Sequence, residues 1–304
     1  MLTVKAVDIY GNNIFAGTPL SIVLNREEDV PADSLELDFA DVKLPVLKEI
    51  ILYRQEKVVF SGEVDEQIRE LSEKGHTLIT ARNSASRLID NEAYPMSFVN
   101  PSTEDIFARY ALPFGFKKYI GENRGYQGRF TVSKGTSCFS VIKRFAKEVY
   151  GAFPACEGDI LYIEGIKSDD TLMFGKGGTP FESLKVVNLR CNRISGVYVK
   201  LKDGEGYSSL VADNEAENEG ISKIRYLNTA SGSAATLIDA DRILAEARGK
   251  SFYAQAVCRG FFGDALGKDA HVQGVDFKLY VSAVRFISGK KGEYTKLTFK
   301  RKEE

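Results

Sequence analysis

A strand that runs directly into a short helix, within residues 76–95, is the stretch that most restricts how this chain can fold. Residues 77–82 alternate in the direction of their side chains, as a β-strand requires. The spacing then becomes helical, with apolar side chains at Ala85, Leu88 and Ile89. Asn83 or Ser84 can cap this helix, because a side-chain oxygen there can accept a hydrogen bond from a first-turn amide. We expect a small apolar helix that closes the open end of a sheet or barrel, in a structural rather than a chemical role.

Alternation between apolar and polar residues recurs throughout the first part of the chain. It is cleanest in residues 33–40, where Leu35, Leu37 and Phe39 share one face and predict a strand buried on one side. Two apolar runs flank residues 54–56 closely enough for a hairpin. Further strands are expected at residues 2–9, 19–24, 49–53, 57–60 and 77–82. About six strands in this region are enough to close a small barrel.

The middle of the chain, residues 97–186, differs because helical spacing replaces much of the alternation. Ser102 followed by Asp105 has the spacing of a capping box, which predicts a helix after it. Thr136 or Ser137 caps a second helix, whose apolar stripe comprises Cys138, Val141, Ile142, Phe145, Ala146 and Val149. Short strands are expected at residues 129–133, 159–163 and 171–174, the last two paired with each other. This segment is predicted to be a small α+β unit.

The last third, residues 187–304, returns to strands. They are expected at residues 193–202, 207–212, 221–227 and 251–259, with a closing hairpin of residues 276–286 and 294–300. A helix is expected through Leu237, Ile238, Ile243, Leu244 and Ala247, ended by Gly249. The predicted fold class is mainly β with an α+β insert. Two similar β-barrel domains, residues 1–96 and 187–304, are joined by a small α+β domain, residues 97–186.

Composition argues against several classes of protein. A formal net charge of -1, with both signs interspersed, does not suit binding to nucleic acid or a membrane through a basic surface. No apolar run approaches the roughly 18 residues of a membrane span, and the N-terminus is too polar for a signal peptide. Reduced, buried thiols are expected, because the four cysteines include no closely spaced pair: Cys138, Cys156, Cys191 and Cys258.

Residues that could carry chemistry are scattered. The two histidines, His76 and His271, belong to no spaced ligand set, and a solvated loop position is expected for His271. Residues 174–180 are glycine-rich but lack the spacing of a phosphate-binding loop, so a plain turn is favoured. The acidic run at residues 213–219 lacks the order of a calcium loop and is interpreted as a solvated loop. We predict no catalytic, cofactor-binding or metal-binding residues, and a structural or assembly protein rather than an enzyme.

Five segments carry a resemblance to a known family: residues 34–39, 59–65, 77–90, 277–286 and 292–299. In order and spacing they resemble the baseplate hub proteins of contractile phage tails and related injection systems, the family of late control protein D. The similarity covers almost the whole chain. In the third segment the family carries a strand, then Ala/Gly-Arg-Asp, then a short helix, and Asn83 stands here where Asp is usual. In the closing hairpin Arg285 replaces the usual histidine.

The resemblance implies a homotrimer in which each subunit supplies two similar β-barrels, so that six barrels surround a pore. Such a ring would join a six-fold tail tube to a three-fold central spike. The implied partners are further copies of the chain, the tail tube protein, the central spike protein and other baseplate proteins, with no cofactor, membrane or sequence-specific nucleic acid. The expected location is the tail or baseplate of a virion or a tail-like particle, assembled in the bacterial cytoplasm. Cell-wall cleavage is expected of a partner, not of this chain.

Two other functions stay open from the sequence. A cell-wall hydrolase associated with phage tails could use carboxylates such as Asp159 or Asp264. A glycan-binding β-module could use exposed tyrosines such as Tyr126 and Tyr207. Wall-lysing activity that an Asp→Asn substitution removes would identify the hydrolase, and binding to immobilised glycans would identify the module.

Overall fold

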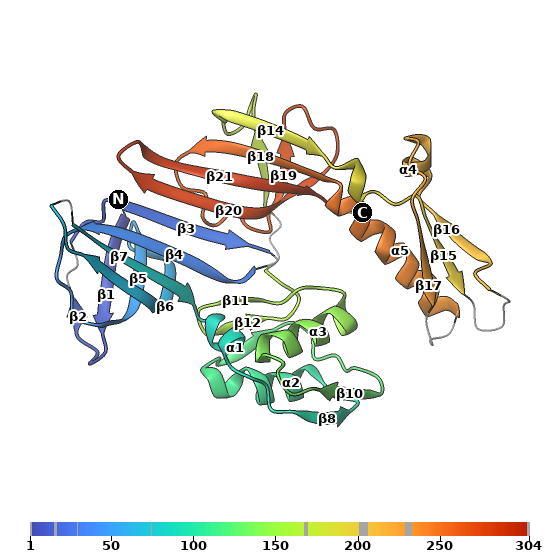
Figure 1. The fold of residues 1–304 in the computed structure, drawn as a ribbon, viewed down its shortest axis with the longest axis horizontal. Coiled ribbons are helices and arrows are strands. Elements are labelled where there is room, and N and C mark those ends of the chain that lie inside the picture. Colours follow the sequence, from blue (N-terminus) through green and yellow to red (C-terminus); the bar gives the residue numbers. More distant parts are fainter. Residues whose placement is uncertain are drawn as a thin grey trace. The chain divides into compact units, whose positions relative to one another are not determined.

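The computed structural model describes residues 2–14, 17–28, 30–73, 75–166, 170–200, 206–228 and 233–302, without the side chains of residues 233–237. Tertiary contacts gather the chain into two units. The first comprises Met1–Asp170, Cys258–Lys268 and Ser282–Lys296, and the second comprises Thr171–Val257, Asp269–Val281 and Leu297–Glu304. Strands dominate both units (Figure 1), which confirms the prediction of a mainly β chain with an α+β segment.

The first unit is built on a sheet with the strand order β20-β3-β4-β7-β6-β5-β1-β2. Alternate side chains are buried as the sequence predicts, since Leu35, Leu37 and Phe39 are each no more than 2% exposed. They share one apolar core with residues of the other strands, and this burial is the main stabilising term of the sheet. The strands are β1 (Leu2–Asp8), β2 (Asn13–Ile14), β3 (Ser21–Glu27), β4 (Val30–Ala40), β5 (Leu47–Arg54), β6 (Lys57–Glu70), β7 (His76–Asn83) and β20 (Leu279–Gly289).

The predicted hairpin of β5 and β6 forms, with a tighter turn than the sequence indicates. Only Gln55 and Glu56 connect the two strands, and both have a positive φ, 48° and 67°. Turns of this type favour Asn-Gly, because a side chain crowds the backbone at positive φ. Neither residue is glycine here, so strand pairing must offset an unfavourable turn.

The short helix after β7 forms, but it does not close the sheet. Leu88 of α1 (Ser86–Asp90) and Ala85, the residue before this helix, are buried in a second apolar core. This core is separate from the core of the sheet. The apolar stripes of α2 (Thr103–Tyr110) and α3 (Cys138–Tyr150) supply most of this core, so they offer the helix more apolar surface to pack on. Asn83 does not cap the helix: its side chain accepts a hydrogen bond from the Ala85 amide, 3.1 Å away, in the turn before it.

Both longer helices of this core begin as the sequence predicts. Ser102 and Asp105 form a complete capping box at the start of α2, and Ser137, not Thr136, caps α3. A left-handed Gly151 ends α3. Short elements complete the region: β8 (Met96–Val99), η1 (Leu112–Phe114), β9 (Lys118–Ile120), β10 (Arg129–Val132), β11 (Ala155–Glu157) and β12 (Ile160–Tyr162).

The predicted pairing of residues 159–163 with residues 171–174 is wrong. β12 pairs antiparallel with β11 and parallel with β9, inside the first unit. β13 (Thr171–Phe174) instead pairs parallel with β19 (Asp269–Val272), in the second unit. A parallel partner so distant in sequence leaves no local signal, whereas a short loop between two apolar runs favours a hairpin. His271 therefore lies on a strand, exposed, and not in a loop.

The second unit contains a long insertion between two paired strands. β14 (Ser183–Asn188) and β18 (Phe252–Arg259) pair antiparallel with Asn188 opposite Phe252. Residues 189–251, here termed the inserted module, take the place of a hairpin turn. β20 and β21 (Gly292–Arg301) form the predicted closing hairpin, and both strands run from one unit into the other. The division of the chain at residues 96 and 186 stays a prediction.

The inserted module is a three-stranded sheet with the order β16-β15-β17, covered on one face by a helix (Figure 1). Val197 and Val199 are fully buried against Leu244 of that helix. Gly249 lies within the helix rather than at its end, and part of the strand predicted at residues 193–202 lies outside the described residues. The elements are η2 (Arg190–Asn192), β15 (Gly196–Lys200), β16 (Ser209–Ala212), α4 (Asn214–Asn218), β17 (Ile224–Asn228) and α5 (Ser233–Lys250).

Candidate functional site

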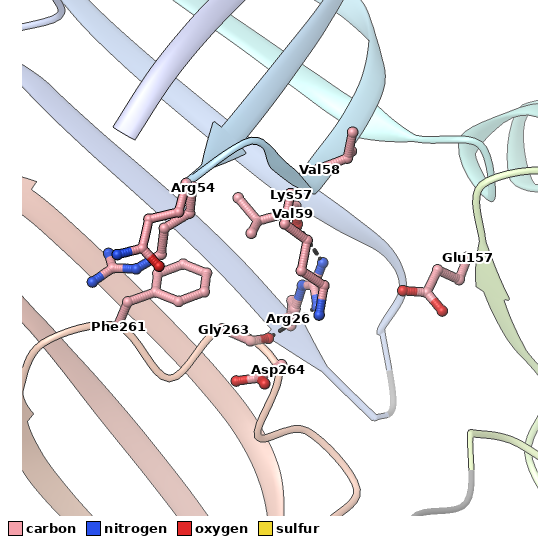
Figure 2. A pocket seen from close by; sticks show the side chains of 10 residues that line it. Arg26, Arg54, Lys57, Val58, Val59, Glu157, Phe261, Gly263 and Asp264 are labelled. Carbon is pink, nitrogen blue, oxygen red and sulfur yellow. Dashed lines mark hydrogen bonds between the residues drawn. The ribbon is translucent and has the colours of Figure 1, made fainter. Parts of the chain in front are cut away.

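A cavity of about 460 Å³ in the first unit, here termed the Arg26 pocket, gathers charged side chains from several segments (Figure 2). β3 contributes Arg26 to the pocket, and the β5–β6 hairpin and residues 261–264 form much of its wall. The lining residues are Arg26, Arg54, Gln55, Lys57, Val58, Val59, Glu157, Phe261, Gly263 and Asp264.

The guanidinium of Arg26 joins three segments in this pocket. Its Nη1 donates to the carbonyl of Gly263 at 2.9 Å, and its Nη2 donates to the carbonyl of Val59 at 2.7 Å. Its Nε forms an ion pair with Asp33, 3.3 Å from Oδ2. The planar fork of arginine suits such multiple contacts, because its donors are held in fixed directions. Arg26 therefore acts as a bracket between β3, β6 and the 261–264 segment.

Asp33, the acidic partner of Arg26, has a pKa above its ordinary value. Burial raises the pKa of Asp33, and the charge of Arg26 and a hydrogen bond with Asn83 offset this only in part. Burial, with the nearby Asp33, also raises the pKa of Cys156 to about 12. A thiol with such a pKa stays protonated at neutral pH and is a poor nucleophile. Asp33 thus pairs with Arg26, and Cys156 is not an activated nucleophile.

A second arginine at the pocket wall, Arg54, is also engaged. Arg54 lies over the ring of Phe261, 4.9 Å from its centroid, and its Nη1 is 2.8 Å from Glu293 Oε2. Stacked and paired arginines of this kind hold segments in place, since the charge is satisfied on both the ring and the carboxylate. Arg26 and Arg54 of the pocket therefore hold strands and loops of the first unit together.

The two carboxylates considered for a hydrolase lie in different surroundings. Asp264 lines the Arg26 pocket. Asp159 lies in the turn between β11 and β12, with Oδ2 2.5 Å from Lys117 Nζ, and this pairing lowers the pKa of Asp159. An ionised carboxylate that is paired with a lysine is poorly suited to act as a general acid.

The two tyrosines considered for a glycan site also differ in their surroundings. Tyr126 packs edge-on against Phe130, at 5.3 Å between ring centroids, in the helical core of the first unit. Tyr207 is 41% exposed and packs against Tyr226 in the inserted module. Only Tyr207 thus belongs to an exposed aromatic group.

The histidines and cysteines fall partly where the sequence places them. His76 lies between two carboxylates, with Nδ1 3.3 Å from Asp38 and Nε2 3.1 Å from Glu70. Three of the four cysteines are buried as expected, but Cys191 is exposed. Among the described residues, no three His, Cys, Asp or Glu side chains gather as metal ligands would. Within the same residues, no helix has the length and apolar character needed to cross a membrane.

A cluster of ion pairs at the base of the inserted module has no counterpart in the sequence prediction. Arg193 and Asp213, whose side chains are 7% and 2% exposed, lie 3.4 Å apart. Glu215 contacts Arg193 at 2.9 Å and Arg301 of β21 at 3.3 Å, and Arg248 reaches Asp213 at 3.2 Å. These five residues, here termed the Arg193 cluster, tie α4, α5 and β21 together.

The acidic run at residues 213–219 is thus not a solvated loop. Asp213 caps α4 by accepting a hydrogen bond from the Ala216 amide. Burial alone would raise the pKa of both Asp213 and Glu215. The Ala216 amide and the charges of Arg193 and Arg248 instead lower the pKa of Asp213, and Arg301 and Arg193 lower the pKa of Glu215. An Asp followed by Glu in the next turn is a helix-start signal that could have identified α4 from the sequence.

No protein-family model and no curated protein sequence matches the chain. Solved structures do match it over nearly its full length. A tail protein from Neisseria meningitidis MC58 aligns with a TM-score of 0.80 and 19% identity, over 99% of this chain and 96% of that one. The 43 kDa tail protein of prophage MuSo2 from Shewanella oneidensis aligns with a TM-score of 0.81 and 16% identity, over 99% and 98%.

A more distant match comes from a secretion system. An Escherichia coli component of the type VI secretion system, described as structurally similar to tail proteins of bacteriophage T4, aligns with a TM-score of 0.59 and 9% identity. That alignment covers 100% of this chain and 77% of the other. Over nearly its full length, this chain therefore shares the fold of the two tail proteins.

Proposed function

We propose that the chain is a structural, non-enzymatic subunit of a tail baseplate hub. The observation that carries the proposal is the full-length match to two tail proteins, which align with TM-scores of 0.80 and 0.81 over at least 96% of each chain. The arginines of the Arg26 pocket and of the Arg193 cluster support it, since their bonds hold separate segments of the chain together.

The proposed assembly is a homotrimer whose β-rich units repeat around a central channel, so that three chains present a pseudo-sixfold ring. One face of the ring would meet the tail tube protein and the other the central spike protein. Closed rotational symmetry gives such a ring without open ends. Unpaired strand edges would be covered by neighbouring subunits, which is a common way to keep edges from aggregating. The proposed location is the tail or baseplate of a virion or tail-like particle.

Sedimentation velocity and negative-stain microscopy test the assembly. The expected results are a species three times the mass of the chain and class averages of a threefold ring with an open centre. The experiment is repeated with the tail tube and spike proteins of the same particle, because partners can be required for closure. A protein that stays monomeric at high micromolar concentration, alone and with both partners, contradicts the proposal.

A further inference from the structure

Among the described residues, none of the helices covers the face of the inserted module's sheet opposite α5, and this face carries a group of tyrosines. Val197 and Val199 of β15 point toward α5, so the residue between them, Tyr198, points to the opposite face. Its direct neighbours across the strands are Leu210 of β16 and Tyr226 of β17. The three rings and two aliphatic side chains of this surface, here termed the tyrosine face, are Tyr198, Tyr207, Tyr226, Leu210 and Ile224.

The rings of this face are ordered against one another and still accessible. Tyr198 and Tyr226 stack with centroids 5.7 Å apart and planes 18° apart, and Tyr207 meets Tyr226 edge-on at 5.1 Å. Tyr226 is nevertheless 61% exposed, and Leu210 is 46% exposed. An apolar ring face beside a phenol hydroxyl offers both a stacking surface and a hydrogen-bonding group.

The size of the face argues for a small ligand. Three strands about 4.8 Å apart, each about five residues of 3.3 Å, give an area on the order of 200 Å². A stable protein interface needs about 800 Å² from each partner. The face therefore has room for a few rings of a small molecule, and too little for a protein partner on its own.

The charge of the face argues against a nucleic acid. By strand alternation Lys200 is the single charged side chain that the described residues place on it, while Asn228 and the tyrosine hydroxyls add neutral polar groups. Single-stranded nucleic acids also stack on aromatic rings, but several cations are needed to neutralise their phosphates. A neutral ligand with one flat apolar side and several hydroxyls fits better.

We propose that the tyrosine face binds an oligosaccharide of pyranose rings with equatorial substituents, stacked on Tyr226 and Tyr198. In such sugars the axial C–H groups form a flat, weakly positive surface, which is attracted to the negative face of an aromatic ring. The ring hydroxyls around the edge can bond to the phenol groups and to Asn228. The inference does not depend on a trimeric ring, since every residue of the face belongs to one chain.

Saturation-transfer NMR on the full-length protein tests it, with chitopentaose as the probe. Saturation is expected to reach the axial ring protons of the sugar. Tyr226→Ala is expected to weaken binding at least tenfold, as loss of one stacked ring does, whereas Tyr226→Phe stays within about threefold of the parent. Tyr94→Ala is the matched control, because Tyr94 is 62% exposed in the first unit, and it should leave binding unchanged.

Several outcomes overturn the proposal. One is the absence of saturation transfer to chitopentaose at 10 mM. The dissociation constant would then be on the order of a hundredfold higher than that of a usable site. Another is binding that both Tyr226→Ala and Tyr207→Ala leave unchanged while each variant keeps the parent's circular dichroism spectrum. Binding of a fifteen-nucleotide oligothymidine, lost in Tyr226→Ala and unaccompanied by sugar binding, would assign the face to nucleic acid instead.

Discussion

At the scale of single residues, the first unit depends on a cation that the sequence does not single out. Arg26 is separated from its hydrogen-bond partner Gly263 by 237 positions, so no local pattern connects them. It donates hydrogen bonds to two carbonyls, and its charge lies 3.3 Å from Asp33. Removal of one member of such a set costs more than the bond itself, because the others lose their compensation.

Substitution Arg26→Met is expected to lower the free energy of unfolding by about 3 kcal/mol, because Asp33 is left half-buried without its counter-ion. Urea unfolding followed by circular dichroism measures it. The double variant Arg26→Met with Asp33→Leu should recover part of the loss, as apolar groups replace the pair. Arg285→Met is the control: Arg285 bonds to Asn25 on the exposed surface, and a change below about 0.5 kcal/mol is expected. Equal losses for both arginines would contradict the role given to Arg26.

The β5–β6 turn offers the opposite case, a residue whose replacement should stabilise. Glu56 has a φ of 67°, where glycine is favoured. Glu56→Gly is therefore expected to raise the free energy of unfolding by about 0.5–1 kcal/mol, visible as a higher melting temperature. Lys57→Gly, one residue along and inside β6, should lower it by a similar amount. A lower melting temperature for Glu56→Gly would show that its side chain contributes more than the turn costs.

At the scale of elements, the inserted module is attached by two adjacent chain segments and by ion pairs. The amide of Leu189 donates to the carbonyl of Ser251 at 2.7 Å, so the segments that enter and leave the module lie side by side. The Arg193 cluster then joins α4 and α5 to β21 through Arg301. The carboxylates of this cluster, Asp213 and Glu215, therefore lie where the module joins β21, and their protonation should weaken this attachment.

Acidification is expected to loosen this junction. Asp213 and Glu215 have folded-state pKa values below their ordinary values of 3.8 and 4.5, so the unfolded chain binds more protons as pH falls. Their contribution to stability is present above about pH 4.5 and is lost as pH falls through the folded-state values. Hydrogen exchange of the module measured between pH 7 and 3 should show this. Glu215→Gln should reduce the pH dependence, and Glu217→Gln, on the exposed part of the same helix, should not.

Deletion of the module tests whether it is an independent insertion. Because Asn188 lies directly opposite Phe252, an Asn-Gly turn can replace residues 189–251 without a change of strand register. The shortened protein is expected to remain folded, with the β content of its remaining strands intact by circular dichroism. Replacement by a single glycine is the control, since it is too short for a two-residue turn and should disrupt the pairing. Loss of structure in both variants would mean that the module is needed for the sheet to form.

Elements with a local signal could be predicted from the sequence, and those set by distant contacts could not. The burial of Leu35, Leu37 and Phe39 and the capping box at Ser102 follow from spacing alone, and both are confirmed. The partner of β13 depends on residues almost a hundred positions away, which spacing does not report. The Arg26 pocket was missed for the same reason, because the residues that line it are adjacent only after folding.

At the scale of the whole molecule, the chain passes between the two units five times, and three of these crossings lie inside strands. The crossings at residues 257–258, 281–282 and 296–297 fall inside β18, β20 and β21. Backbone groups in the middle of a strand are held by their neighbours, so a protease cannot readily bind there in an extended form. Proteolysis at these three positions should therefore be slow.

Limited trypsin digestion tests this directly. Lys296 marks one crossing inside β21, whereas Lys290 and Lys291 lie in the β20–β21 turn, and all three side chains are exposed. Cleavage after Lys290 and Lys291 is expected to precede cleavage after Lys296 by at least tenfold in rate, measured by mass spectrometry of early time points. Comparable rates would mean that the strand opens at the crossing.

The pairing of β3 with β20 has a consequence for how the protein is made. Ile22–Glu27 pair with Ala283–Ser288, so one edge of the first sheet lacks its neighbour until the much later residues 283–288 have been synthesised. β13 waits in the same way for β19. Such nonlocal closures are slow and leave unpaired backbone accessible to other chains. Cells that produce this polypeptide should therefore depend on chaperones between the synthesis of β3 and the synthesis of β20.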